Sequence, residues 1–295
     1  MVPSGIQSFT KYSSSIIKDF LEFFDSPEKN IMIIADPAVL PFTRKFANEF
    51  GVDFDPQSST VTNGISSSII ATELLAEDES LFSKTKGIVY EGIGLQLNSK
   101  NPYVFPILKS SESDYSENKG EIINESPVLV AGYQGLNNNR VTITGSTMMC
   151  SNMQILRTAT EPSHTSSPNY IFCEELIEWN FGESGILKAV NVQHKSEKEV
   201  MPTEYPIKTD IEYSIDLLQW NKKTGKWMTF NNADAQLEFV MIDPYYRITL
   251  PQEKVGYPTY KVSLRTPDRL GVFHFKVNYT RKGYTTLNVA TKVRF

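Results

Sequence analysis

The stretch from Asp268 to Phe295, DRLGVFHFKVNYTRKGYTTLNVATKVRF, decides the class of the carboxyl-terminal part of the chain. Its apolar side chains alternate with polar ones at Phe273, Phe275, Val277 and Tyr279. This period of two is typical of a strand with one buried face. A turn is predicted at 281–283, RKG, after which the alternation resumes on a returning strand. The stretch therefore predicts an antiparallel pair of strands in a β domain.

The same alternation continues upstream to about residue 186. Apolar positions of further strands occur in Ile211–Leu217, Leu237–Met241 and Tyr260–Leu264, and Asn221–Gly225 predicts a hairpin turn before Trp227. About seven strands at this spacing, without helices, predict an antiparallel β-sandwich of immunoglobulin-like type over residues 183–295.

The amino-terminal part has a different pattern. A helix is predicted near Tyr12–Asp25, then a buried parallel strand at Ile31–Ala35, then a helix that ends near Phe50 before Gly51. The order helix, buried strand, helix is typical of α/β proteins. Since no strand precedes the first helix, we expect residues 1–182 to be a Rossmann-like, amidotransferase-like α/β domain that lacks its first strand–helix units.

The rest of this domain is predicted from short patterns. Residues Ile69–Leu75 are predicted as a short helix and Ser110–Glu125 as a polar loop, with a turn at 137–139. A third helix is expected at Asn169–Phe181, before a domain boundary at Gly182. Its expected buried side is Tyr170, Cys173, Ile177 and Asn180, and its expected outer side is Glu174, Glu175 and Glu178. Strands are expected at Gly87–Tyr90, Tyr103–Leu108, Pro127–Tyr133 and Arg140–Thr144.

Net charge and the distribution of apolar residues indicate which kinds of partner to expect. The net charge of −5 comes without a run of Lys and Arg, so we expect no nucleic-acid partner. No apolar run approaches the ~20 residues needed to span a bilayer, and the first residues do not resemble a signal peptide. The chain stops at Phe295 without a polar tail, from which we expect that further sequence normally follows.

Cys150 is the strongest candidate for a catalytic residue, with Glu161 and His164 as its partners in a nucleophilic triad. A nucleophile elbow needs glycines beside the nucleophile, whereas Cys150 lies in MMCSN, so we predict a buried or spare thiol instead. Cys150 and Cys173 allow at most one disulfide, which would fit any compartment.

No cofactor or metal is expected. Residues 91–97, EGIGLQL, begin like a dinucleotide-binding loop, but Leu97 replaces the third glycine and no helix follows, so a turn is predicted. The histidines His164, His194 and His274 lack the spacing of metal ligands, and His274 is expected at the surface.

Two N-glycosylation sequons are present, Asn124-Glu125-Ser126 and Asn278-Tyr279-Thr280. Asn278 lies on the outward face of its predicted strand. Asn124 is the poorer acceptor, because Pro127 follows its sequon and restricts the backbone.

Several segments resemble, in the same order, the non-catalytic subunit family of oligosaccharyltransferase, called the wheat-germ-agglutinin-binding protein type in fungi and a dolichyl-diphosphooligosaccharide–protein glycosyltransferase subunit in animals. The segments are EGIG with NPYVFPIL (91–108), VLVAGYQGLNNNRVTITGS (128–146), NYIFCEELIEWNFGESGILKAV (169–190), IEYSIDLLQW (211–220), GKW (225–227), QLEFVMIDPYYRITL (236–250) and GVFHFKVNYTRKGYT (271–285).

The resemblance implies a scaffolding subunit of a complex that transfers a dolichol-linked oligosaccharide to asparagine. Its partners would be the catalytic and other accessory subunits, and a helix missing from this chain would cross the endoplasmic-reticulum membrane once, with this region in the lumen. The family's catalytic motifs belong to another subunit, so no catalytic residue is carried over. Two alternatives are a secreted carbohydrate-binding β-sandwich, with Trp220 and Trp227 as sugar platforms, and an amidotransferase-like hydrolase that uses Cys150. For the two tryptophans, packing inside the sandwich is the favoured interpretation.

Overall fold

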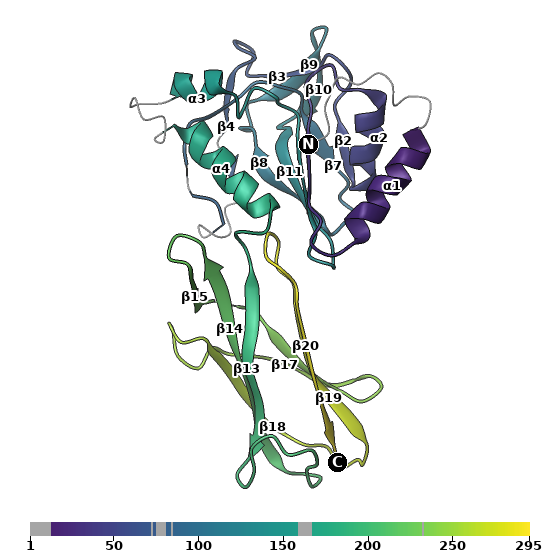
Figure 1. Cartoon of the computed structure of the whole chain (residues 1–295), viewed down its shortest axis with the longest axis vertical. Helices are drawn as coiled ribbons and strands as arrows, with labels where there is room; N and C mark the ends of the chain where they lie inside the picture. Colours follow the sequence, from purple (N-terminus) through teal and green to yellow (C-terminus); the bar gives the residue numbers. More distant parts are fainter. Residues whose placement is uncertain (1–12, 72, 75–80, 84, 159–166, 232) are drawn as a thin grey trace. The chain divides into compact units, whose positions relative to one another are not determined.

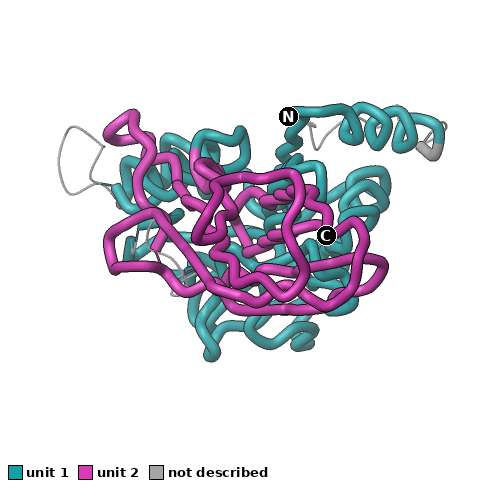
Figure 2. Tube along the Cα trace, turned by 90° about the horizontal axis from the view of Figure 1, so that it is seen from below, with its two compact units in different colours: residues 1–183 teal, residues 184–295 magenta. Residues whose placement is uncertain are grey.

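The computed structural model describes residues 13–71, 73–74, 81–83, 85–158, 167–231 and 233–295. The chain divides into two compact units, unit 1 at residues 1–183 and unit 2 at residues 184–295 (Figures 1 and 2). Each unit has its own sheets and its own core, so the two are described separately.

Unit 1 is built on a seven-stranded sheet with the order β1-β12-β11-β7-β2, in which β8 also pairs with β11 and β5 with β8. β1 and β12 are parallel and the other pairs are antiparallel. The bounds are β1 Ile31–Ile34, β2 Val52–Phe54, β5 Glu73–Leu74, β7 Leu95–Leu97, β8 Val104–Lys109, β11 Val128–Gln134 and β12 Arg140–Thr144. The parallel pairing predicted for Ile31–Ala35 is confirmed.

Helices cover both faces of this sheet (Figure 1). α1, Ser13–Asp25, and α2, Pro41–Glu49, pack on the face that carries Val141 and Ile143 of β12. α4, Pro168–Asn180, packs on the opposite face, where Arg140 and Thr142 of the same strand meet the end of the helix. β12 is buried along its whole length, as expected for a strand between two layers of helices.

The contact between β12 and α4 buries a cation. The Arg140 guanidinium donates a hydrogen bond of 2.6 Å to the carbonyl of Trp179 and lies 4.9 Å from the centre of its ring. Burial lowers the pKa of Arg140 to about 10, which still leaves the side chain charged at neutral pH. The positive charge faces the carboxyl end of α4, where the helix dipole favours it.

Three predictions about the helices and loops of unit 1 are wrong. The helix predicted at Ile69–Leu75 is wrong for the described residues of that range. Ile69 and Ala71 are buried on either side of an exposed Ile70, and β4 Ile69–Ala71 pairs with β6 Ile88–Tyr90. Ser110–Glu125 is not a loop throughout. β9 Tyr115–Asn118 and β10 Glu121–Glu125 form a hairpin there, which β3 Thr60–Thr62 extends.

The third error is the orientation of α4. Ile177 was predicted to be buried but is 48% exposed, because the helix instead buries a row of larger groups at Phe172, Leu176 and Trp179. Cys173 and Asn180 are buried as predicted. A short helix, α3 Asn152–Thr158, was not predicted at all.

Unit 2 consists of two antiparallel four-stranded sheets. The first joins β13 Leu187–Ser196, β14 Asp210–Asn221, β15 Lys226–Thr229 and β18 Thr259–Arg265. The second has the order β17-β16-β19-β20, with bounds Pro244–Thr249, Gln236–Val240, Val272–Tyr279 and Leu287–Arg294. The general prediction of a helix-free, two-sheet β unit is confirmed for the described residues, with eight strands rather than about seven.

Aromatic rings form the core between these two sheets. Phe275 of β19 lies 5.3 Å from Tyr213 of β14 and 4.9 Å from Phe239 of β16, measured between ring centres. The alternation predicted for β19 is confirmed, since Phe273, Phe275 and Val277 are fully buried. Met241 was predicted to continue β16, but the strand ends before it and its side chain is 40% exposed.

Candidate functional site

A backbone crossing lies at the carboxyl end of β12. The Ile93 N–H donates to the carbonyl of Gly145, at 2.9 Å. A Cβ atom at Gly92 would lie 2.2 Å from the Gly145 oxygen, and one at Gly145 would lie 2.1 Å from the Ile93 oxygen. Gly92, from the segment that begins like a dinucleotide-binding loop, and Gly145 therefore let two backbone segments touch.

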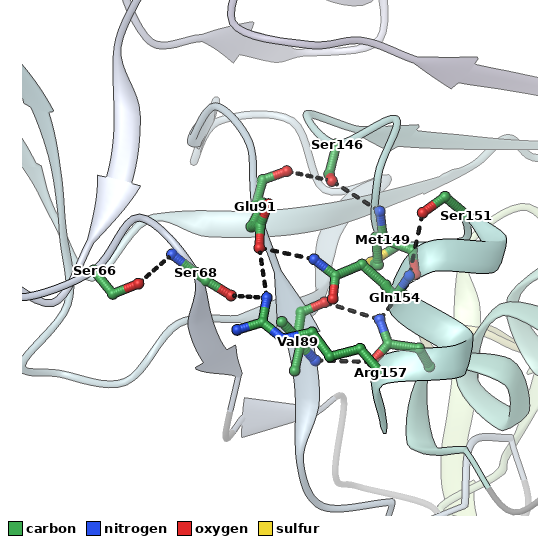
Figure 3. Close-up of polar contacts among 10 residues, drawn as sticks. Ser66, Ser68, Val89, Glu91, Ser146, Met149, Ser151, Gln154 and Arg157 are labelled. Atoms are coloured by element: carbon green, nitrogen blue, oxygen red, sulfur yellow. Dashed lines mark hydrogen bonds and ion pairs between the residues drawn. The ribbon is translucent and has the colours of Figure 1, made fainter. Parts of the chain in front are cut away.

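A polar cluster beside this crossing is centred on Glu91 (Figure 3). Its Oε1 accepts hydrogen bonds from Gln154, at 2.8 Å, and from Arg157, at 3.1 Å. Arg157 also donates to Ser68, at 3.3 Å. The Glu91 and Arg157 side chains are 32% and 59% exposed, so this ion pair contributes at most about 1 kcal/mol to stability. The cluster attaches α3 to the loops after β6 and β3.

Asn169 fixes the start of α4 from the other side. Its amide nitrogen donates to the carbonyls of Val89 and Met149, both at 2.8 Å, and its amide oxygen accepts from the Val89 N–H at 2.9 Å. The side chain is fully buried. Its three hydrogen bonds satisfy backbone N–H and carbonyl groups that would otherwise be buried without a partner.

Cys150 and Cys173 form a disulfide, with their Cα atoms 5.9 Å apart. It joins the segment before α3 to the middle of α4. The prediction of a buried or spare thiol at Cys150 is wrong, and its sulfur, bonded to Cys173, is not available as a thiolate nucleophile. The proposed triad partners Glu161 and His164 lie outside the described residues.

The two sequons differ in their surroundings. Asn278 is exposed on β19, while its neighbours Val277 and Tyr279 point into the core. Asn124 is only partly exposed, and its amide nitrogen lies 3.3 Å from Oδ1 and 3.4 Å from Oδ2 of Asp55. Asp55 is fully buried and also accepts from the Gln96 amide, at 2.8 Å.

The two histidines that the structure describes, His194 and His274, are not arranged as metal ligands. His194 is buried, and its Nδ1 lies 2.8 Å from the Tyr205 hydroxyl. His274 is half-buried on the outer face of β19, and His164 lies outside the described residues. Within the described ranges no three His, Cys, Asp or Glu side chains are grouped as a metal site would require.

Trp220 and Trp227 form a cross-strand pair between β14 and β15, with ring centres 5.4 Å apart. Trp227 is 38% exposed, and the Lys188 ammonium lies 5.5 Å from the centre of its ring. The prediction that these rings pack inside the sandwich is wrong, because both tryptophans lie on the face of the sheet opposite to Tyr213.

The disulfide, the Asn169 contacts and the Asp55–Asn124 contact were not identified from sequence. Only the Cys150–Cys173 pair had a usable signal there, as the two cysteines of the chain. The other two depend on segments about 70–80 residues apart in sequence, which a single sequence does not bring together.

Comparison with known proteins gives a consistent result over both units. The profile of the OST48 N-terminal domain matches residues 6–183, and that of the OST48 middle domain matches residues 192–295. These two spans together cover most of the chain.

Individual relatives agree with the domain matches. The chain is similar to the 48 kDa subunit of dolichyl-diphosphooligosaccharide–protein glycosyltransferase from Arabidopsis thaliana, with 33% identity over 94% of this chain and 68% of that protein. It is 28% identical to the Drosophila melanogaster protein of the same name, over 97% of this chain and 69% of that protein. The Danio rerio protein is 32% identical, over 90% of this chain and 64% of the relative.

Proposed function

The chain belongs to the OST48 family, and from this membership we propose that it is a scaffolding subunit of the endoplasmic-reticulum oligosaccharyltransferase. That complex transfers an oligosaccharide from a dolichyl diphosphate to the asparagine of N-x-S/T sequons. The observation that carries the proposal is similarity to both OST48 domains in order, over residues 6–183 and 192–295.

The part that this chain plays is structural rather than chemical. Cys150 is held in a disulfide, the Glu91 carboxylate is engaged by Gln154 and Arg157, and the Asp55 carboxylate is buried against two amides. Each of these groups is committed to holding the fold. The chain's contribution is therefore to present rigid surfaces to the catalytic subunit and to the other accessory subunits.

The disulfide and the exposed sequon support a luminal position. Disulfides persist in oxidising compartments such as the endoplasmic-reticulum lumen, and Asn278 is an acceptor only there. Among the described residues no helix is long and apolar enough to cross a membrane. In this proposal the described region is luminal, and a single transmembrane helix outside it anchors the protein.

The finer fold assignment is also part of the proposal. Unit 1 has a Rossmann-like arrangement of the amidotransferase type, supported by the parallel β1–β12 pair between two layers of helices. Unit 2 is an immunoglobulin-like sandwich, supported by its two antiparallel sheets. The corresponding domains are residues 1–182 and 183–295.

Depletion of the protein in its own cells tests this function. Glycoproteins with several sequons should lose occupancy, and re-expression of the full-length protein should restore it. The protein should also co-purify from detergent-solubilised membranes with the catalytic subunit. Full sequon occupancy after complete depletion would contradict the proposal.

A further inference from the structure

One end of unit 2 carries a group of exposed apolar side chains. The register places the connections 197–209, 241–243 and 266–271 at the same end. Ser196 pairs with Ile211, Asp210 with Arg265, Val240 with His274 and Val272 with Arg294. The Tyr205 N–H donates there to the Arg294 carbonyl and so joins the first sheet's 197–209 connection to β20 of the second sheet, while Thr209 N donates to the Thr266 hydroxyl within the first sheet. Figure 1 marks the last residue at this end of the unit.

We call five of these side chains the apolar tip: Met241, Ile242, Tyr245, Leu270 and Val272. Ile242 and Leu270 are 88% and 76% exposed, and the other three are between 37% and 42% exposed. A Cβ placed on Gly271 would lie 2.6 Å from the Met241 methyl, so the two loops of the tip touch. The neighbouring connection 197–209 adds exposed side chains at Val200, Met201 and Ile207.

The two most exposed side chains of the tip lie in loops, and Tyr245 and Val272 lie at the adjoining ends of β17 and β19. Ile242 lies in the turn between β16 and β17, and Leu270 lies in the connection between β18 and β19. The exposed charged groups next to them are Asp243, Asp268, Arg269 and Arg294, two of each sign. The connection 197–209 adds three exposed acidic groups and two basic ones, at Glu197, Glu199, Glu204, Lys198 and Lys208. This end of the unit therefore has no excess of positive charge that would direct it to an anionic surface.

From this geometry we propose that the apolar tip inserts into the interfacial layer of the luminal leaflet of the bilayer. The occupant follows from the proposed function, because a dolichyl chain is a long hydrocarbon that resides in a bilayer and the complex must work beside it. Projecting aliphatic side chains with a tyrosine next to them suit the boundary between headgroups and acyl chains. Because this end has no excess of positive charge, apolar burial drives the contact.

Vesicle flotation of the purified 1–295 chain, with its disulfide intact, tests the inference. The chain should float with neutral phosphatidylcholine vesicles, equally well when phosphatidylserine is included, and at high salt as well as low. Ile242→Asp and Leu270→Asp should each reduce partitioning at least about tenfold. Both side chains are mostly exposed, so neither change removes core packing.

Val255→Asp is the matched control. Val255 is 84% exposed, but it lies in the connection 250–258 at the other end of the sandwich, where Thr229 donates to the Gly256 carbonyl. This variant should float like the unmodified chain. Equal loss in all three variants would overturn the inference, as would binding only to anionic vesicles with loss at high salt.

Two further outcomes are informative. The first distinguishes a lipid from a protein as the partner of the tip, and the second distinguishes failure of this inference from failure of the proposed scaffold function. If the unmodified chain does not float and Ile242→Asp loses co-precipitation with the other subunits, the inference is overturned and the tip binds a protein rather than a lipid. No flotation, together with full restoration of glycosylation by Ile242→Asp in depleted cells, would overturn the tip's role while leaving the scaffold function intact.

Discussion

The side-chain nitrogens of Asn124 and Asn278 face different surroundings. The Asn124 nitrogen lies against the buried Asp55 carboxylate, whereas Asn278 is exposed on β19. A glycan on Asn124 would have to occupy space next to Asp55, which is fully buried. Glycosylation there would oppose folding of unit 1.

We therefore expect Asn278 to be glycosylated more fully than Asn124. Thr280→Ala, which removes the Asn278 sequon, should increase electrophoretic mobility by one glycan, and Ser126→Ala should leave mobility unchanged. Peptide mapping after expression in the secretory pathway measures both sites directly. Occupied Asn124 with bare Asn278 would contradict the assignment.

His194 makes unit 2 sensitive to acid. It is 2% exposed, its ring lies 5.1 Å from that of Phe275, and burial lowers its pKa from the usual value near 6.5. The unfolded chain takes up a proton as pH falls below about 6.5, whereas the folded chain does so only at lower pH. The contribution of His194 is therefore present above that pH and is lost as pH falls.

His194→Phe should accordingly reduce the loss of unfolding free energy between pH 7 and pH 5. Denaturant unfolding at the two values, compared with the unmodified chain, measures this slope. Asn288→Gln is the control, since it changes an exposed side chain of β20 that does not titrate and should leave the slope unchanged. Equal slopes for the His194 variant and the unmodified chain would show that this histidine does not titrate differently on folding.

At the scale of elements, the disulfide connects α4 to the segment before α3. It closes a loop with a sequence separation of 23 residues, for which chain entropy gives a stabilisation of about 3 kcal/mol. The contacts of Asn169 with Val89 and Met149 fix the same region independently. The disulfide therefore stabilises a region that the Asn169 hydrogen bonds also hold together.

We expect Cys150→Ala, Cys173→Ala and the double variant to lose the same stability, because each removes the same bond. Thermal unfolding of the three variants under oxidising conditions measures this. Glycosylation in cells should follow the abundance of each variant. A nucleophilic role for Cys150 would be revealed if Cys150→Ala abolished glycosylation at an abundance where Cys173→Ala did not.

Elements whose burial follows a simple period could be predicted from the sequence. Phe273 to Tyr279 alternate with period two and form β19, and the apolar run at Ile31 forms the parallel strand β1. The polar hairpin β9–β10 could not be predicted, because its strands pair with each other and with β3 rather than packing an apolar face. The buried face of α4 was misassigned, because the contacts of Trp179 with β12 outweigh the local pattern around Ile177.

The same distinction between local pattern and tertiary contact applies to the candidate site residues. Exposure of Asn278 could be predicted because it depends on local strand alternation. The partners of Cys150 and Asn124 could not, because they come from Cys173 and Asp55, elsewhere in the chain. Tertiary contacts decide what these side chains do.

Phe275 carries much of the packing in unit 2. It is fully buried, and its ring contacts those of Tyr213, Phe239 and His194. Phe275→Ala should lower the unfolding free energy of unit 2 by about 3–5 kcal/mol, because it removes a large core side chain and leaves a cavity. Lys292→Ala, at an exposed position of β20, should change it by no more than about 0.5 kcal/mol. Denaturant unfolding gives both values, and a small effect at Phe275 would contradict the described core.

At the scale of the whole molecule, each unit has its own core and its own sheets. A scaffold works through the surfaces that such cores hold in place, so loss of a core should act on the complex through assembly. A loss of about 3–5 kcal/mol is a large share of the ~5–15 kcal/mol that stabilises a domain. Abundance, assembly and glycosylation should therefore fall together.

The most direct measurement is co-precipitation of full-length Phe275→Ala protein with the catalytic subunit, read beside glycosylation of a reporter in the same cells. Lys292→Ala serves as the matched control and should behave like the unmodified protein in both readouts. For Phe275→Ala we expect loss of co-precipitated catalytic subunit and a proportional loss of reporter glycosylation. Loss of glycosylation with the complex fully assembled would contradict the scaffold function.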